Sequence, residues 1–367
     1  SMKKVLLFGG SFDPIHNAHL VLARHAYQEL KVDKCYFIIA KNPRWKHPDT
    51  TPEERLDMLK LALQDYKEFE ISLIEFNSNS DPTYTYDTIV ELNKIEQNKY
   101  YYLIGSDQEQ LLHKWYKIDE LSKLVQFVVF KRFGYPLDED NLKKYHCEVL
   151  KSEEFDISST NIRKLKQINS PLKVLNYIAE HELYYVKFIK QYITDKRLKH
   201  SFSVASLAYE IAQVNLIDPN KAYLAGLLHD IAKQTPLERS LQILFDNYQD
   251  VTKSVGEWAY HQFVGAFIAE KEFEIEDKNI LHAICYHATG IDNMSELDKV
   301  IYCADKLDPL RGWDSTKLIE ECKKDINQGF ISVLKENIIF FKKKSIDYKN
   351  KYTLKCLSYY LDRKDYE

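Results

Sequence analysis

The segment KVLLFGGSFDPIHNAHL, residues 4–20, decides the fold of the first half of this sequence. Its apolar start predicts a buried β-strand that ends at Gly9 and Gly10, and the pattern that follows predicts a helix. Glycines allow a ligand to approach the main chain, and the first turn of a helix offers free N–H groups to an anion. The strand, turn and helix therefore predict a phosphate-binding loop that includes Gly9, Gly10, Ser11 and Phe12.

The same alternation of strand and helix continues to about residue 130. Further strands are expected at residues 35–40, 71–76, 100–105 and 125–130, and helices at residues 17–30, 51–66 and 86–95. Alternating elements of this kind are typical of an α/β fold with a doubly wound parallel sheet and helices on both faces. Such sheets bind ligands at the carboxyl ends of their strands, so we expect the binding residues of this half there.

Long segments with an apolar period of 3.6 residues fill the sequence from about residue 186 onward. Two examples are SFSVASLAYEIAQ (residues 201–213) and AYLAGLLHDIAK (residues 222–233). This periodicity predicts an all-helical second domain. A chain of 367 residues exceeds what one hydrophobic core usually organises, so we expect two domains, residues 1–185 and 186–367.

The composition excludes several classes of partner. The formal net charge of −4 provides no field that would gather nucleic acid. No apolar run approaches the roughly 18 residues that span a bilayer, and the sequence shows no signal peptide. The six cysteines have neither metal-binding nor disulfide spacing, as in reduced thiols. We expect a cytoplasmic protein that acts on small molecules and binds neither nucleic acid nor membranes, whereas the sequence leaves its oligomeric state open.

Two groups of polar residues in the first half suit phosphates. His16 and His19 are three residues apart at the expected helix start, so both imidazoles can face the end of the first strand. Taken alone, this spacing is more often that of two surface histidines. A later segment, FDISSTNIRKL (residues 155–165), combines hydroxyls at a helix start with an arginine one turn on; these residues are Ser158, Ser159, Thr160 and Arg163. Its ordinary interpretation is a helix cap followed by a solvated arginine.

Together, GGSFDPIHNAHL (9–20) and ISSTNIR (157–163) resemble the paired signatures of the nucleotidyltransferases that transfer adenylyl groups from ATP. Over residues 3–185 the sequence is similar to the bacterial nicotinate-mononucleotide adenylyltransferases in particular. The segments that carry this similarity are YTYDTI (84–89), IGSD (104–107), HKWYKIDEL (113–121) and VVFKR (128–132).

This resemblance implies an in-line attack of the mononucleotide phosphate on the α-phosphorus of ATP, with release of pyrophosphate and with Mg²⁺ bound to the nucleotide. Positioning and charge stabilisation would supply the catalysis. The resemblance assigns the ATP phosphates to His16, His19, Ser159, Thr160 and Arg163, of which the two histidines and the arginine would be catalytic. It assigns the pyridine nucleotide to Thr85, Asp107, Trp115 and Arg132.

The sequence departs from that family at two places. Ala18 stands where the family usually has glycine between the two histidines. We expect its methyl group to crowd the main chain where that main chain approaches ATP. In NPRWK (residues 42–46), Arg44 and Trp45 replace the usual Pro and His, while Lys46 is kept as an expected contact to ATP. The preference for the acceptor mononucleotide at this loop is therefore open.

The helical half contains a set of potential metal ligands on successive expected helices: His200, His229, Asp230, His261, His287 and Asp305. Each histidine alone is more often an ordinary core residue. Asp230 and Asp305, however, lie inside apolar segments, where a carboxylate is costly without a cation. Four imidazoles and two carboxylates suit Fe, Mn, Co, Ni or Zn better than Mg.

The order H…HD…H…H…D resembles the HD superfamily of metal-dependent phosphohydrolases. Over residues 186–367 the sequence is similar to bacterial HD hydrolases that split diadenosine tetraphosphate symmetrically, through RLKHSFSVASLA (197–208), AGLLHDIAK (225–233), YHQFVGA (260–266), ICYHATG (284–290) and YCADKLDPLRG (302–312). The resemblance implies two iron ions. It assigns one to His200, His229, Asp230 and Asp305, and the other to Asp230, His261 and His287. It also implies that Lys233, Thr289 and Arg311 contact phosphates, Lys233 beside Asp230 in the catalytic centre.

Two alternatives stay open at this point. The first half is compatible with nicotinamide mononucleotide as the acceptor, because the contacts that separate acid from amide are not fixed by the sequence. The second half is compatible with a noncatalytic HD module that senses a nucleotide. The complete set of six ligands argues against the sensing module, because a retired catalytic site would be free to lose ligands.

Overall fold

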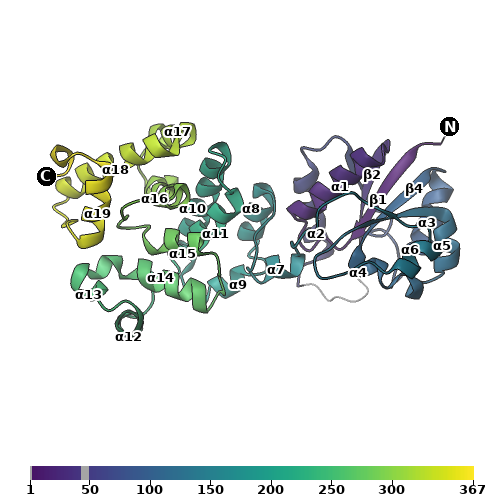
Figure 1. Ribbon diagram of the computed structural model, residues 1–367, viewed down its shortest axis with the longest axis horizontal. Coiled ribbons are helices and arrows are strands. Elements are labelled where there is room, and N and C mark those ends of the chain that lie inside the picture. Colours follow the sequence, from purple (N-terminus) through teal and green to yellow (C-terminus); the bar gives the residue numbers. More distant parts are fainter. Residues whose placement is uncertain (1, 43–48) are drawn as a thin grey trace. The chain divides into compact units, whose positions relative to one another are not determined.

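The computed structural model describes residues 2–42 and 49–367. Lys46, which we expected from the sequence to contact ATP, lies outside these described residues. The chain forms two compact units, Ser1–Tyr177 and Ile178–Glu367, which are treated separately below (Figure 1). The division falls within helix α8 (Leu172–Glu180), slightly before the expected boundary between residues 185 and 186. No linker rich in glycine or proline marks it, because the chain passes this point as a helix.

The first unit alternates strands and helices as expected. Its strands are β1 (Lys4–Gly10), β2 (Lys34–Ile39), β3 (Phe69–Ser72), β4 (Lys99–Gly105), β5 (Val125–Phe130) and β6 (Glu148–Val149). Its helices are α1 (Asn17–Glu29), α2 (Pro52–Leu63), α3 (Thr85–Ile95), α4 (Ser106–Glu109), the 3₁₀ turn η1 (Leu112–Lys114), α5 (Ile118–Leu124), α6 (Glu139–Lys144), α7 (Ser159–Arg163) and α8.

The six strands form one parallel sheet in the order β3-β2-β1-β4-β5-β6. This confirms the predicted doubly wound fold. Strand β1 pairs with β2 on one side and with β4 on the other, so the strand order reverses between β1 and β4. In sheets of this type, ligands bind beyond the carboxyl ends of the strands at that reversal.

The sheet differs from the expectation at its two edges. Strand β3 covers residues 69–72 rather than 71–76, because β2 offers it partners only from Cys35 to Ile38. The chain then turns, with the main-chain N–H of Asn77 donating to the carbonyl of Leu73. Strand β6 was not predicted, since its two residues are too few to show an alternating pattern.

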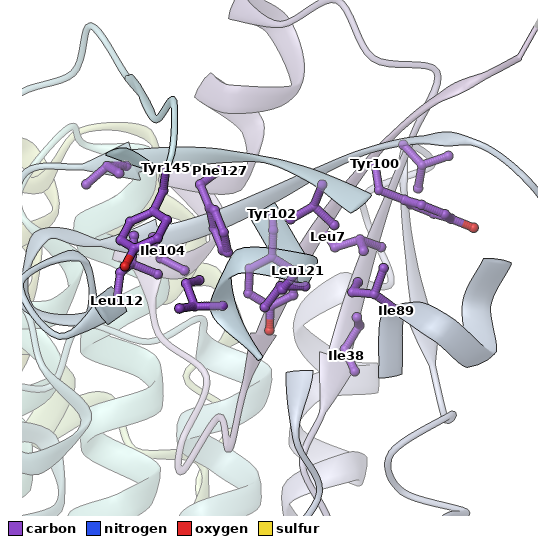
Figure 2. Close-up of a cluster of buried hydrophobic side chains, with 14 residues drawn as sticks. Leu7, Ile38, Ile89, Tyr100, Tyr102, Ile104, Leu112, Leu121, Phe127 and Tyr145 are labelled. Atoms are coloured by element: carbon purple, nitrogen blue, oxygen red, sulfur yellow. The ribbon is translucent and has the colours of Figure 1, made fainter. Parts of the chain in front are cut away.

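A cluster of buried side chains packs α3 and α5 against one face of the sheet (Figure 2). Leu7, Tyr102 and Phe127 come from β1, β4 and β5, while Ile89 and Leu121 come from α3 and α5. Burying each such side chain contributes about 1.5–3 kcal/mol. The same core reaches the predicted phosphate loop, because a Cβ at Gly9 would lie 2.5 Å from the Tyr102 hydroxyl. A larger residue at that position would therefore have to displace the buried Tyr102 side chain.

The second unit contains helices throughout, and none of its residues, all of which the structure describes, lies in a strand. Its elements are α9 (Val186–Ile189), α10 (Asp195–Val214), α11 (Pro219–Leu228), α12 (Leu237–Asn247), α13 (Val251–Ser254), η2 (Glu257–Ala259), α14 (Tyr260–Lys271), α15 (Lys278–Cys285), α16 (Glu296–Leu307), η3 (Pro309–Arg311), α17 (Thr316–Lys324), α18 (Ile326–Lys343), α19 (Lys351–Tyr360) and η4 (Arg363–Asp365). In the described part of the chain, no helix combines the length and apolarity needed to span a membrane.

Helix α11 is almost completely buried in this unit. Its residues from Ala222 to Leu228 are all buried, as expected for a helix that is apolar on every side. Gly226 lets it lie very close to α10, because a Cβ at this position would be 2.8 Å from the Cα of Ala205. The end of α11 therefore delivers its next residues, His229 and Asp230, directly into the interior.

Two helices are shorter than the sequence indicated. The segment AYLAGLLHDIAK was expected to be one helix, but α11 ends at Leu228 and Asp230 lies in the following turn. This turn is tightened, with the N–H of Ile231 donating to the carbonyl of Leu228, three residues back. The segment KNILHAICYH (residues 278–287) has the same apolar period and was also expected to be helical, but α15 ends at Cys285, before His287. Neighbours on a regular helix point about 100° apart, so leaving the helix allows His229 and Asp230 to face one centre.

Candidate nucleotide site and candidate metal centre

The two histidines of the first unit lie stacked at the start of α1. Their rings are 3.6 Å apart with an interplanar angle of 18°. His16 caps the helix, and its Nδ1 accepts a hydrogen bond from the N–H of His19 at 3.4 Å. In return, Nδ1 of His19 accepts from the N–H of His16 at 3.0 Å. Both imidazoles are thus fixed at the carboxyl end of β1, where the sequence predicted the phosphates.

These hydrogen bonds set the protonation pattern of both rings. Because each Nδ1 accepts, a neutral ring carries its proton on Nε2, which can donate to an anion. Burial, together with the positive charge of Arg132, lowers the pKa of His16 to about 3. His16 is therefore a neutral hydrogen-bond donor at working pH.

The loop between β1 and α1 is held in an unusual conformation. Phe12 has a φ of 49°, in the left-handed region that a bulky residue rarely adopts. Its ring is buried, with edge-on contacts to Phe8 and His19 at centroid distances of 5.8 and 5.2 Å. Any contact of Phe12 with a nucleotide would accordingly be made by its main chain, as it would at Gly9 and Gly10.

The structure brings the second predicted phosphate segment to this loop. The hydroxyl of Ser159 donates to the carbonyl of Pro14 at 2.9 Å, although 145 residues separate them. Arg163 donates to the carbonyl of Asp13 at 2.8 Å and to the hydroxyl of Thr160 at 3.0 Å. Ser158 accepts from the N–H of Asn161 at 3.1 Å, as in an ordinary helix cap. The two signature segments therefore form one surface.

Two of the four residues predicted for the pyridine nucleotide lie directly after neighbouring strands. Arg132, just after β5, forms an ion pair of 2.9 Å with Asp107, just after β4. Thr85 is the first residue of α3. Trp115 is half-buried and packs edge-on against Phe127 at 5.8 Å, so one side of its indole belongs to the core. Asp107 and Arg132 therefore lie at the carboxyl ends of β4 and β5, whereas Trp115 packs on Tyr102 and Phe127 within these strands.

Sequence reasoning missed the residue that holds the phosphate loop in place. Arg55 of α2 is fully buried, and its guanidinium donates to the carbonyl of Ser11 at 2.9 Å and to those of Ala40 and Lys41 at 2.7 Å each. It therefore ties the ends of β1 and β2 together. The available signal was an arginine on the apolar face of an amphipathic helix.

The six predicted metal ligands of the second unit converge in its interior. In the first donor group, the Nε2 atoms of His200 and His229 lie 3.3 Å apart. The Oδ1 atom of Asp305 lies 3.1 Å from the former and 3.3 Å from the latter. The Oδ2 atom of Asp230 completes the group at 3.5 and 3.6 Å from the same two nitrogens.

The second donor group uses the other oxygen of the same carboxylate. The Oδ1 atom of Asp230 lies 3.4 Å from Nε2 of His261 and 3.5 Å from Nε2 of His287. Those two nitrogens are 3.1 Å apart. Asp230 thus faces the first donor group with one oxygen and the second with the other, as a bridging ligand would.

The hydrogen bonds behind the imidazoles fit a bound cation. Nδ1 of His229 donates to the carbonyl of Gly226 at 2.6 Å, and Nδ1 of His287 donates to that of Ile284 at 2.7 Å. Nδ1 of His200 donates to the Asp308 carboxylate at 2.6 Å. With Nδ1 as the donor, the Nε2 atom of each ring in its neutral form presents a lone pair to the centre, an arrangement that a shared metal ion would stabilise.

The charges differ between the two donor groups. Burial raises the pKa values of Asp230 and Asp305, but the surrounding imidazoles outweigh it and hold both pKa values well below the usual range. Burial lowers the pKa of His287 to about 4, so this ring is neutral. Burial lowers the pKa of His200, but hydrogen bonds to Asp305 and Asp308 outweigh it and raise this pKa to about 9. Burial is likewise outweighed at His229, whose pKa is raised by Asp230 and Asp305. Because metals bind neutral imidazoles and ionised carboxylates, a metal in the first donor group would displace the protons of these two rings.

The phosphate contacts predicted for this unit fall into two classes. Arg311 is 43% exposed and donates to Oδ1 of Asp305 at 2.8 Å, and Lys233 is exposed close to Asp230. Thr289, in contrast, is buried. Its hydroxyl accepts from the Gln262 amide at 2.9 Å and donates to the carbonyl of Gly290 at 2.8 Å, which favours a structural role over contact with substrate.

Three further residues around the centre were not predicted. Asp308 binds His200 and also accepts from the Ser203 hydroxyl at 2.5 Å. Arg197 donates to Oδ2 of Asp230 at 3.1 Å, and Lys306 lies beside Asp305. The signal that could have found Asp308 is its position three residues after Asp305, just past the end of α16.

Comparison with known proteins relates the two parts of the chain to different families. Residues 7–165 match the Cytidylyltransferase-like family, and residues 197–310 match the HD domain family. A protein of Mycoplasma pneumoniae named probable nicotinate-nucleotide adenylyltransferase/Ap4A hydrolase is 33% identical, over 90% of this chain and 98% of its own length. A protein of Mycoplasma genitalium with the same name is 32% identical, over 91% of this chain and 97% of its own length. The nicotinate-nucleotide adenylyltransferase of Bacillus subtilis is 35% identical, over 50% of this chain and 99% of its own length.

Proposed function

Because this chain belongs to the family of the nicotinate-nucleotide adenylyltransferase/Ap4A hydrolases, we propose that it joins two nucleotide activities. The first unit transfers AMP from ATP to nicotinate mononucleotide and releases pyrophosphate. The second unit hydrolyses diadenosine tetraphosphate (Ap4A) to two molecules of ADP. The observation that carries the proposal is the Asp230 carboxylate, which faces two separate donor groups with its two oxygens.

In the first unit, the phosphates of ATP would lie over the loop between β1 and α1. The Nε2–H groups of His16 and His19 and the guanidinium of Arg163 would stabilise the charge that develops toward pyrophosphate. Ser158, Ser159 and Thr160, which lie next to this loop through the bond of Ser159 to Pro14, would also contact the phosphates. Mg²⁺ would be bound mainly by the nucleotide and water, because the site adds few carboxylates of its own. Thr85, Asp107, Trp115 and Arg132 would receive the pyridine nucleotide.

In the second unit, two transition-metal ions, with Fe or Mn as the first candidates, would occupy the two donor groups. When bound, such ions activate water near neutral pH and stabilise charge on phosphate oxygens. The chain itself contributes the orientation of its ligands, because Gly226, Ile284 and Asp308 fix three of the imidazoles through Nδ1. Arg311 and Lys233 remain accessible to bind the tetraphosphate.

One experiment tests the hydrolase. The purified protein is analysed for metals and incubated with a panel of nucleotides, and the products are separated by chromatography. About two metal ions per chain and ADP as the sole product from Ap4A support the proposal. A mixture of AMP and ATP would contradict symmetrical cleavage. Metal content without hydrolysis of any nucleotide would instead favour a noncatalytic sensing module.

A parallel experiment tests the transferase. Nicotinate and nicotinamide mononucleotides are each incubated with ATP, and formation of the dinucleotide is followed. Faster reaction with the nicotinate form supports the proposed acceptor, and a preference for the amide would change the substrate but not the reaction class. No product from either mononucleotide would refute the transferase.

A further inference from the structure

We propose that Lys306 is a positioning residue that fixes the second donor group relative to the first. From α16, which carries Asp305 of the first group, it anchors the main chain of His287 in the second group. This inference rests on the proposed two-metal site and adds to it a residue to which no role was assigned above.

The contacts of Lys306 define this role. Its ammonium donates to the main-chain carbonyl of His287 at 2.8 Å. The same Nζ lies 3.7 Å from Oδ2 of Asp305 and 3.6 Å from the centre of the Tyr302 ring. A carbonyl, a carboxylate and an aromatic face thus surround one cation, which offsets the cost of removing it from water.

Exposure separates Lys306 from the other cations at the centre. The side chains of Arg197 and Arg311 are 34% and 43% exposed, so both can reach a ligand from solvent. The side chain of Lys306 is 16% exposed, and its hydrogen bond goes to main chain within the protein. Lys306 is therefore placed to organise ligands rather than to bind a substrate phosphate.

His287 needs such an anchor because it lies past the end of α15. Two neighbouring helices hold the segment that contains it. From α14, Gln262 accepts from the N–H groups of Ala288 and Thr289 at 3.0 and 3.1 Å. From α16, Lys306 holds the carbonyl of His287. Gln262 adjoins His261 within the second donor group, whereas Lys306 connects this segment to the helix of the first group.

Removing the ammonium should therefore affect the two groups in opposite directions. The segment of His287 loses its link to α16, so the second donor group should bind its metal more weakly. The first donor group loses a positive charge beside Asp305, and this charge would repel a bound cation. Its affinity should stay the same or increase.

The test compares Lys306→Met with Lys299→Met in the full-length chain. Lys299 is a matched control on the same helix. It also lies over an aromatic ring, 5.1 Å from the centre of Tyr360, and donates to Asn327 at 2.7 Å. Binding of Mn²⁺ is titrated into metal-free protein, and the ions retained are counted by mass spectrometry.

We expect Lys306→Met to weaken the second binding step by roughly 10- to 100-fold, as is usual when a group that supports a metal ligand is lost. The bound metal should fall from about two ions to about one, with the first step unchanged or tighter. Lys299→Met should retain both steps. If Lys306→Met fails to fold, Lys306→Gln decides, because its amide can still donate toward the carbonyl and should give a smaller loss in the same step.

Two results would overturn the proposal. One is unchanged binding of both ions in a folded Lys306 variant. The other is a parallel weakening of both steps together with a lower melting temperature of the metal-free protein, which would indicate general destabilisation. Wild-type protein that binds fewer than two ions would refute the two-metal site itself, so the two failures are distinguishable.

Discussion

Replacing Gly226 by alanine would force apart α10, which carries His200, and α11, which ends just before His229. The added Cβ would lie 2.8 Å from Cα and 3.1 Å from the main-chain N of Ala205 in α10. Carbon atoms in normal contact are about 3.5–4.0 Å apart. Because both neighbours are main-chain atoms of a helix, no side chain can rotate away, and α10 and α11 must separate by roughly 1 Å.

The expected cost is the difference between two effects. Overpacking of a core costs about 1–3 kcal/mol, whereas alanine gains about 1 kcal/mol over glycine inside a helix. The net loss is up to about 2 kcal/mol, which lowers the melting temperature of a domain this size by up to about 8 °C. Metal binding should also weaken, because the carbonyl of Gly226 accepts from His229 at 2.6 Å and Nε2 of His229 lies 3.3 Å from that of His200.

Gly265 in α14 provides a matched control. A Cβ there would meet its nearest neighbour, Ile284, at 3.5 Å, which is an ordinary contact. Gly265→Ala should therefore leave stability unchanged or raise it by up to about 1 kcal/mol. Both variants are compared by thermal denaturation of metal-free protein, followed by titration with Mn²⁺. A Gly226→Ala variant that is as stable as Gly265→Ala and binds metal normally would refute the packing argument.

Four further changes test the two sites. Asp230→Ala should remove both metals and all Ap4A hydrolysis while leaving adenylyl transfer intact, since each unit has its own core; metal analysis and both assays check this. His19→Ala should lower the kcat of adenylyl transfer by roughly two orders of magnitude, and normal turnover would show that the phosphates lie elsewhere. Asp308→Asn should weaken metal binding in the first donor group by roughly 10- to 100-fold and spare the second, as a two-step titration would reveal. The pKa of His16 is about 3 in the folded protein and 6.5 in the unfolded chain. As the pH falls below 6.5, the unfolded chain gains a proton that the folded protein does not, and the free energy of unfolding falls by about 2 kcal/mol at pH 5. Denaturation curves of His16→Asn should lack this part of the pH dependence.

Sequence patterns were sufficient wherever the structure depends on neighbours along the chain. The alternation of strands and helices up to residue 130 predicted the parallel sheet, and the period of 3.6 residues predicted the helical unit, both of which the structure confirms. The similarity to both families is likewise confirmed by the relatives that match most of the chain. The roles of the individual site residues and the boundary at residues 185 and 186 remain predictions.

The hydrophobic pattern of the sequence did not predict where a helix ends when tertiary contacts decide that end. The apolar period of AYLAGLLHDIAK continues through Asp230, so nothing local marks the end of α11 at Leu228. A regular helix would continue to satisfy the main chain, but it would turn His229 and Asp230 away from each other. The turn is favoured because it buries both side chains among ligands from other helices.

The sequence by itself therefore determined the two fold classes and a set of residue types suited to phosphates and metals. Only the tertiary structure decided which atoms face one another. Asp308 supports His200 across 108 residues, and the carbonyl of Ser11 meets Arg55 across 44. Hydrogen bonds and ion pairs act over a few ångströms in space, whatever the separation in sequence, so partners such as Lys306 and His287 become visible only after the helices have packed.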